Sequence, residues 1–356
     1  MTNGSLLERT LSTNLAWNRA RIKFLAAFMV ALTQTRNVNL MRVAAHFGGR
    51  ATAASSYKRI QRFLRSFDLP MSELAQLLIR LMKLTPPFVV VIDRTEWKFG
   101  GEWHNILTLS LASEDVAVPI LWRFLKRKGC CDDAEREKIL SDFLKLFAAS
   151  DIKYVCADRE FASVRWLKFL TQEKIPYRLR IKANHELTDK HGKVMKARKL
   201  LQTARVGEAV ICQRWRKLWG RYRVCVTGRK RADGELLILI SNEPSLEMIA
   251  EYRRRWQIET LFGCLKSRGF DLEETHLRDS KRLEKLLGLL ALAICWSWLA
   301  GEKLSQRKPI TVKKHGRRAK SVFRFGLDHL EQVFRIGAPF TKTQARTEFI
   351  LLLSCT

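Results

Sequence analysis

Residues 88–97 read FVVVIDRTEW, and this stretch decides the fold that we predict. Pro86 and Pro87 precede it and end the helical pattern of the residues before them. The run from Phe88 to Ile92 is apolar and mostly β-branched, which is typical of a strand buried on both faces. Asp93 follows at once, so we expect a buried strand that ends at a carboxylate.

A second stretch has the same pattern. Residues 151–161 read DIKYVCADREF, which predicts a buried strand that ends at Asp158. Strand-like segments at 105–126 and helical segments at 134–150 and 163–174 surround the two stretches and indicate an α/β core with a mixed sheet. Both aspartates are then expected at a sheet edge, where α/β proteins place their sites. The plain alternative is that loops after strands often begin with Asp.

Residues from about 176 to 243 are rich in strand-forming patterns and in cations, and they are expected to form an insertion in this core. Trp215 and Trp219 lie there in QRWRKLWGRYR, between arginines and a lysine. Cations can follow phosphates while an indole stacks on an unpaired base. Equally, the two tryptophans can pack a small core.

The N-terminal part, residues 1–85, has helical periodicity. A helical run reaches Gly48-Gly49, and a basic helix with Lys58, Arg59 and Arg62 follows. A helix, a turn and a basic helix suggest a DNA reader of the helix-turn-helix kind. Residues 1–87 hold 13 Lys+Arg and 3 Asp+Glu (13 − 3 = +10), which favours DNA contact over a helical bundle with a solvated basic face.

The overall charge points to a polyanionic partner. The chain has 65 Lys+Arg against 35 Asp+Glu, a formal net charge of +30. Nucleic acid is favoured, and a ribosome-like or anionic membrane surface is the lesser alternative. The longest apolar run, residues 286–300, is shorter than the about 20 residues of a membrane span and predicts a buried helix. With no CxxC pair and no signal-peptide pattern, we expect a cytoplasmic protein and no membrane partner.

The segment YRRRWQIETLFGCLKSRGF, residues 252–270, holds a single carboxylate among five cations. Tyr252, Arg255, Glu259 and Lys266 are spaced by three, four and seven residues, which keeps them on one face of a helix. A surface Arg255–Glu259 pair is the ordinary reading of this spacing.

Glu259 can also converge with Asp93 and Asp158 into a cluster of three carboxylates. Such a cluster needs cations, because like charges raise one another's pKa. Oxygen ligands of this kind suit Mg²⁺ or Mn²⁺, and two such ions can promote phosphoryl transfer.

The spacing Y-x2-R-x3-E-x6-K is similar to the signature around the third acidic residue in bacterial DDE transposases of the insertion-sequence-4 family. FVVVIDRTEW and YVCADREF resemble the family's first and second acidic motifs. The resemblance covers residues 86–300 and implies an RNase H-like catalytic core with the β-rich insertion at about 176–243. It is compatible with an all-helical DNA-binding domain at 1–85, and residues 301–356 (12 − 4 = +8) then form a basic helical C-terminal region.

The resemblance also implies roles for single residues. Asp93, Asp158 and Glu259 would bind two Mg²⁺, for which Mn²⁺ can substitute. Glu160 would have a supporting role. DNA-end contacts would come from Tyr252, Arg255, Lys266 and Trp256, the last matching a tryptophan that in family members helps to hold a flipped base.

The function that we expect is therefore that of a transposase that cuts at the ends of a mobile element and joins the 3′ ends to target DNA. The resemblance implies a hairpin as one route for cutting the second strand, and the sequence leaves other routes open. A homodimer is expected in the DNA complex, and the protein is expected at the bacterial nucleoid. An RNase H-like structure-selective nuclease and a non-catalytic DNA-binding protein are the alternatives. The nuclease would need no strand transfer, and the binding protein would show no metal-dependent turnover.

Overall fold

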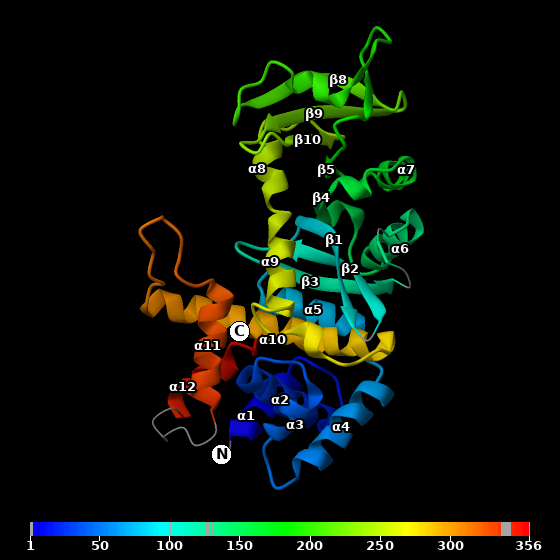
Figure 1. The fold of residues 1–356 in the computed structure, drawn as a ribbon. Coiled ribbons are helices and arrows are strands. Elements are labelled where there is room, and N and C mark those ends of the chain that lie inside the picture. Colours follow the sequence, from blue (N-terminus) through cyan, green and yellow to red (C-terminus); the bar gives the residue numbers. More distant parts are fainter. Residues whose placement is uncertain (1–2, 100, 126–127, 130, 336–342, 356) are drawn as a thin grey trace.

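The protein is described from a computed structural model, which places residues 3–99, 101–125, 128–129, 131–335 and 343–355. Helices from both ends of the chain lie at one end of an elongated molecule, a mixed sheet with flanking helices forms its middle, and a strand-rich part forms the other end (Figure 1). The helices are α1 (Asn3–Ser12), α2 (Arg19–Thr35), α3 (Leu40–Ala45), α4 (Ala53–Ser66), α5 (Met71–Leu81), α6 (Asp133–Leu144), α7 (Val164–Gln172), α8 (Met248–Arg253), α9 (Trp256–Leu265), α10 (Ser280–Arg307), α11 (Val322–Phe334) and α12 (Thr343–Leu351).

All named strands of the described residues belong to one mixed sheet, in the order β3-β2-β1-β4-β5-β10-β9-β8-β6-β7. β1 pairs with β4 in parallel and with β2 antiparallel, and β4 pairs with β5 in parallel. The strands are β1 (Phe88–Phe99), β2 (Glu102–Ala112), β3 (Ala117–Leu125), β4 (Ile152–Ala157), β5 (Tyr177–Arg180), β6 (Glu186–Thr188), β7 (Val194–Lys196), β8 (Ala209–Leu218), β9 (Tyr222–Lys230) and β10 (Leu236–Ser241).

The first strand is longer than the apolar run predicts. β1 does not end at Asp93 but continues to Phe99, because its pairing with β2 runs on from Asp93↔Thr108 to Phe99↔Glu102. Thr95 and Trp97 are buried in this extension, while the residues between them are less so. The extension therefore buries one face only. Its sequence is partly polar, so an apolar run does not predict it.

The predicted insertion is not a separate sheet. β10 pairs antiparallel with β5, so β6 to β10 extend the core sheet from its β5 edge. Because β5 also pairs in parallel with β4, it belongs to the core, and the extra strands begin after Arg180. The strand-rich character that was predicted for residues 176–243 is confirmed.

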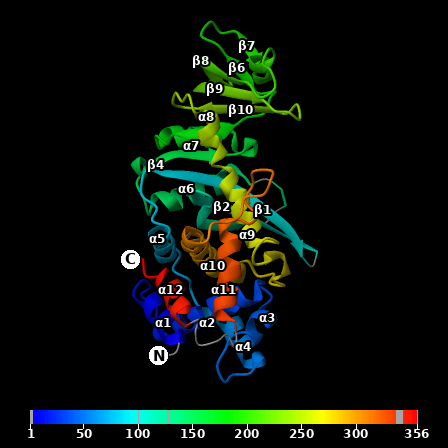
Figure 2. The ribbon, with the colours of Figure 1, turned by 90° about the vertical axis from the view of Figure 1, so that its left-hand side faces the viewer.

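The apolar run 286–300 lies inside α10, as predicted for a buried helix. α10 packs against β3, α5, α2, α4 and α11 and runs between the sheet and the terminal helices (Figures 1 and 2). Among the helices that the structure describes, it alone is long and apolar enough to cross a membrane, and 83% of its most apolar window is buried within the protein.

The C-terminal helices complete the N-terminal helical layer. α11 packs on α10 and α2, and α12 packs on α1 (Figure 2). α10 and α11 come close through two glycines, since a methyl group on Gly301 would overlap the carbonyl oxygen of Val322, and one on Gly326 would overlap that of Ser297. Helices α1 to α4, α11 and α12 thus share one packed layer, and the domain limits 1–85 and 301–356 stay predictions.

Candidate active site

Two aspartates are brought together by strand register. Ile92 of β1 pairs with Ala157 of β4, and Asp93 and Asp158 come directly after these partners. Since the strands are parallel, both carboxylates lie at the same edge of the β1–β4 pairing, Asp93 within β1 and Asp158 directly after β4. The sequence predicts this arrangement through the two apolar runs, and the register of β1 and β4 confirms it.

The segment that carries Tyr252, Arg255 and Glu259 crosses this edge, but it is not one continuous helix. α8 ends at Arg253, α9 begins at Trp256, and the backbone between them is tightened by bonds from Arg255 N to Tyr252 O and from Gln257 N to Arg254 O, 3.0 and 3.1 Å. Lys266 follows the last residue of α9 in a non-helical conformation. The expectation of one helix face for all four residues is therefore wrong for Lys266.

Arg255 joins the helix to the sheet. Its Nη1 lies 2.7 Å from Oδ2 of Asp93, and its Nη2 lies 2.6 Å from Oε1 of Glu259. Its side chain is only 7% exposed, so both ion pairs are shielded from water on the arginine side. The predicted Arg255–Glu259 pair is present, but it is part of a bridge to Asp93 rather than a surface pair.

Burial changes the acid chemistry of Asp93. The loss of solvation raises the pKa of Asp93 to about 6, although Arg255 and the backbone N–H of Arg94 favour its charged form. Glu160 and Asp158 raise this pKa further by repulsion. Burial by itself would lower the pKa of Arg255, but Tyr252 and the aspartates raise it above its ordinary value. The pair is thus charged above about pH 6.

Tyr252 holds the second aspartate. Its hydroxyl donates to Oδ1 of Asp158 at 3.3 Å, and its ring is buried beneath the guanidinium of Arg255. Burial raises the pKa of Tyr252, so the phenol keeps its proton and remains a donor. Arg180 at the end of β5 lies 3.7 Å from the same oxygen of Asp158 and is a site residue that the sequence patterns did not single out.

A cavity of about 230 Å³ opens beside these groups. Tyr252 and the half-exposed Trp256 line it together with Leu237 and Ile249. Five arginines complete the lining, namely Arg180, Arg229, Arg231, Arg253 and Arg255. Such a wall of guanidinium groups beside aromatic rings suits phosphate and base chemistry.

Lys266 lies away from the aspartates. Its Nζ donates to the backbone oxygen of Glu96 and pairs with Glu273, both at 3.0 Å, and it sits 5.8 Å from the ring centre of Trp97. The structure therefore places it beside the far part of β1, with 22% of its side chain exposed.

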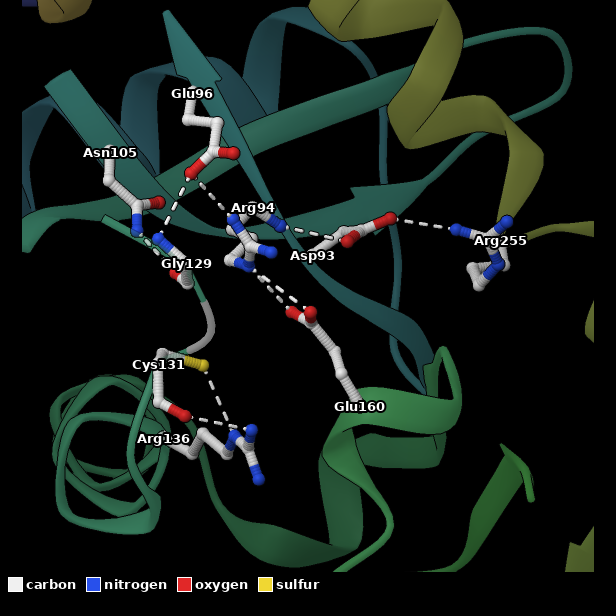
Figure 3. A network of polar contacts seen from close by, with 9 residues as sticks. All are labelled: Asp93, Arg94, Glu96, Asn105, Gly129, Cys131, Arg136, Glu160 and Arg255. Carbon is white, nitrogen blue, oxygen red and sulfur yellow. Dashed lines mark hydrogen bonds and ion pairs between the residues drawn. The ribbon is translucent and has the colours of Figure 1, made fainter. Parts of the chain in front are cut away.

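A further carboxylate, Glu160, supports the site through Arg94, as Figure 3 shows. The Nε of Arg94 donates to both carboxylate oxygens of Glu160, at 2.9 and 3.2 Å, and its Nη1 pairs with Glu96 at 3.1 Å. Because Arg94 adjoins Asp93 on β1, this pairing ties the loop after β4 to the strand that carries the first aspartate. Sequence reasoning gave Glu160 a supporting role but missed Arg94.

Comparison with known proteins gives the family of the chain. Residues 89–296, more than half of the chain, match the transposase DDE domain family. The chain belongs to this family. A solved structure of the piggyBac transposase, a synaptic complex with hairpin DNA, is similar over 95% of this chain and 76% of its own, at 15% identity and a TM-score of 0.47. Among curated proteins, no relative matches the chain.

The chain is accordingly a DDE transposase, an enzyme of DNA transposition. Enzymes with this domain generally use divalent metal ions. In the described part of the chain, no three His, Cys, Asp or Glu side chains are grouped so that they could hold a metal ion. The oxygen donors of Asp93, Asp158 and Glu259 are of the right type, but Arg255 bridges two of them.

The transposase presents the predicted DNA-binding helix on its surface. α3 and α4 pack together across Gly48 and Gly49, both with positive φ, and Lys58, Arg59 and Arg62 of α4 are exposed. The guanidinium of Arg59 rests over the rings of Phe24 and Phe47, at 5.7 Å from each. Lys58 and Arg62 make no such ring contact among the described residues and are freer to reach a ligand.

The two tryptophans of the strand-rich part differ. Trp219 packs edge-on against His185 and Tyr222, which is the core-packing alternative. Trp215 is half-buried under the guanidinium of Arg223, 4.4 Å from its ring centre. Of the two, only Trp215 combines a cation and an indole as the base-stacking hypothesis requires.

Proposed function

We propose that this transposase belongs to the insertion-sequence-4 group and that it cuts at the ends of its element and joins the 3′ ends to target DNA. The observation that carries the proposal is the meeting of Asp93 and Asp158 at the end of the β1–β4 pairing, opposite Tyr252, Arg255 and Glu259. The spacing of these last three residues with Lys266 supports the narrower assignment.

The core is proposed to be RNase H-like. Its support is the strand order β3-β2-β1-β4-β5, in which β1 to β3 form an antiparallel meander and β1, β4 and β5 are parallel. This arrangement sets the first two carboxylates on adjacent strands and leaves the third to a later helix. The sheet can then fix two ligands, while α9 supplies the third.

Asp93, Asp158 and Glu259 are proposed to hold Mg²⁺, or Mn²⁺ in its place. A divalent ion bound there supplies an activated water or 3′-hydroxyl and stabilises the leaving oxygen. The protein's own part is orientation: the Tyr252 hydroxyl fixes Asp158, and Arg255 fixes Asp93 and Glu259 until DNA arrives. Arg255 can then turn one of its N–H groups to a phosphate.

The phosphates of the element's end are proposed to lie along the arginine-lined cavity, with Trp256 and Trp215 as candidates for contact with an unpaired base. Lys266 is proposed to contact phosphates further along β1. Lys58, Arg59 and Arg62 of α4 are proposed to read the DNA end at the opposite end of the molecule. The arginine-lined cavity, Lys266 and α4 lie on different elements, so a long stretch of duplex would span the protein.

Bringing two ends together requires two copies of the chain, and we propose a homodimer in the DNA complex. The host is proposed to be bacterial, with the enzyme acting in the cytoplasm on nucleoid DNA. A hairpin is the proposed route for cutting the second strand. Light scattering of the protein with and without DNA ends would test the dimer, and gel analysis of cut ends would test the hairpin.

The deciding experiment uses supercoiled DNA that carries the element's own ends, with purified protein and Mg²⁺. Wild type should cut at the ends and give joined products, whereas Glu259→Gln should do neither. Glu247→Gln, at an exposed carboxylate directly before α8, is the control and should behave as wild type. Cutting at branched or random sites without joining would contradict the proposal, as would an active Glu259→Gln.

A further inference from the structure

A basic hairpin projects from the protein between α10 and α11, at residues 308–320 (Figure 1). Its sequence, KPITVKKHGRRAK, holds six Lys+Arg and no Asp or Glu. Val312 bridges Arg318, and the tip is closed by a bond from Lys313 N to Arg317 O at 2.8 Å. Gly316 takes a positive φ of 78° at the tip. The hairpin thus has a defined backbone shape.

Packing does not explain the charges of this hairpin. Arg318, the residue directly after the tip, pairs with Asp115 at 3.2 Å, and Lys320, near the base, pairs with Asp328 at 2.6 Å. These two contacts attach the second arm of the hairpin to the protein. The other four cations are exposed and have no acidic partner within 4.0 Å among the described residues. They are Lys308, Lys313, Lys314 and Arg317. Four unpaired cations on a projecting loop repel one another unless an anion binds them.

The second arm of the hairpin reaches the rim of a groove of about 1140 Å³, since Asp115, the partner of Arg318, lines that groove. The groove runs between the α5–β1 connection, the β2–β3 turn, the α8–α9 segment and α10. Its acids are Glu114, Asp115 and Glu302. Its cations, none with an acidic partner within 4.0 Å among the described residues, are Lys83, Lys153, Arg253, Arg254 and Lys303.

The groove also reaches the active site. Trp256 lines both the groove and the small arginine-lined cavity that contains Tyr252 and Arg255. Arg253 is shared in the same way. A DNA strand that ran from the carboxylates past Trp256 would therefore enter the groove. It would meet the hairpin at the opposite rim of the groove.

We propose that the groove and the hairpin together bind target DNA through its phosphate backbone. The proposal rests on the function proposed above, and it assigns to this surface the second DNA substrate of the same site. Contacts from lysines and arginines to phosphates position DNA but carry no sequence information. That suits a target, whose sequence varies from one joining event to the next, whereas the element's ends need a reader of bases.

The first test measures binding to a 30-base-pair duplex of arbitrary sequence at several salt concentrations. A triple variant, Lys313→Gln, Lys314→Gln and Arg317→Gln, removes three exposed charges and leaves the backbone bonds in place. Each phosphate contact contributes about 0.9 to the slope of log affinity against log salt, so the slope should become less steep by about 2 to 3. The control replaces the exposed Lys138, Lys168 and Lys174 by Gln and should leave the slope unchanged.

The second test separates target from ends. The hairpin variant should cut the element's ends within about twofold of wild type and should join pre-cut ends to a plasmid at least tenfold more slowly. Equal losses of cutting and joining would overturn the proposal, because the hairpin would then serve the ends, and so would normal joining. If wild type neither cuts nor joins, the proposed function fails, while an unchanged salt slope alone would overturn the DNA surface.

Discussion

The guanidinium of Arg255 lies between two carboxylates that come from different parts of the fold, 2.7 Å from Asp93 on β1 and 2.6 Å from Glu259 on α9. One buried cation thus balances two acids that the proposed chemistry assigns to a metal ion. A divalent ion that coordinates both carboxylates has to replace at least one of these ion pairs. Arg255 would therefore compete with a metal ion for these carboxylates.

Removing this cation should strengthen metal binding. Arg255→Gln leaves Asp93 and Glu259 without their shared partner, so we expect Mn²⁺ to bind the DNA-free protein at least tenfold more tightly, as measured by electron paramagnetic resonance of free Mn²⁺. The gain comes from lost competition, since the carboxylates then need another cation. Arg254→Gln, the exposed neighbour, is the control and should keep the wild-type affinity. Equal affinities for all three proteins would show that Arg255 does not compete with the metal.

The buried carboxylate of Asp93 should make stability depend on pH. Its pKa is raised by burial from 3.8 to about 6, so the protonated form is favoured by folding. The contribution of Asp93 to the free energy of unfolding is therefore fully present below about pH 4 and is lost as the pH rises through about 6. Asp93→Asn removes this dependence.

We therefore expect Asp93→Asn to gain stability relative to wild type between pH 4.5 and pH 7.5, by about 2 kcal/mol. Urea unfolding at the two pH values in metal-free buffer measures the difference. At pH 4.5 Asp93 is protonated in the wild type as well, so the ion pair with Arg255 is lost only in the comparison at pH 7.5, and its effect is already contained in the pKa of about 6. A difference between the two proteins that is constant with pH would contradict the raised pKa.

The Arg94–Glu160 contact should couple the loop after β4 to β1. The two side chains are 19% and 26% exposed, and the Nε–H of Arg94 is shared between both oxygens of Glu160, so removing one partner leaves a charge poorly solvated. A double-mutant cycle with Arg94→Met and Glu160→Gln should give a coupling free energy of about 1 to 3 kcal/mol by urea unfolding. The same cycle on the exposed Arg165–Glu137 pair should give a smaller coupling. Additive effects at Arg94 and Glu160 would mean that the contact does not support the site.

Much of this site could be predicted because its residues are marked by local patterns. The apolar runs before Asp93 and Asp158 predict two strands, and parallel pairing of those strands is enough to bring the aspartates together. The extension of β1 to Phe99 was not predicted, because it depends on pairing with β2 and not on an apolar run. The break between α8 and α9 was not predicted either, because RRRW contains no Gly or Pro that would indicate it.

Contacts between distant segments could not be predicted. Glu160 binds Arg94 and Arg318 binds Asp115 only because the fold brings those segments together. The position of Lys266 shows the same limit, since a spacing of seven residues implies one face only if the helix continues. The charge of residues 301–356 was visible in the sequence, but their packing against α1 and α2 was not.

The crossing of α10 and α11 gives a prediction about stability. A methyl group at Gly326 would overlap the backbone of Ser297 and Gly301, and the backbone of a buried helix cannot move away as a flexible side chain can. Gly326→Ala should therefore lower the free energy of unfolding by at least about 3 kcal/mol. Gly263→Ala in α9 is the matched control, because its added methyl group would meet only the flexible side chain of Arg268, at 2.9 Å. Urea unfolding compares the two, and a Gly326→Ala protein as stable as Gly263→Ala would show that the helices can separate without cost.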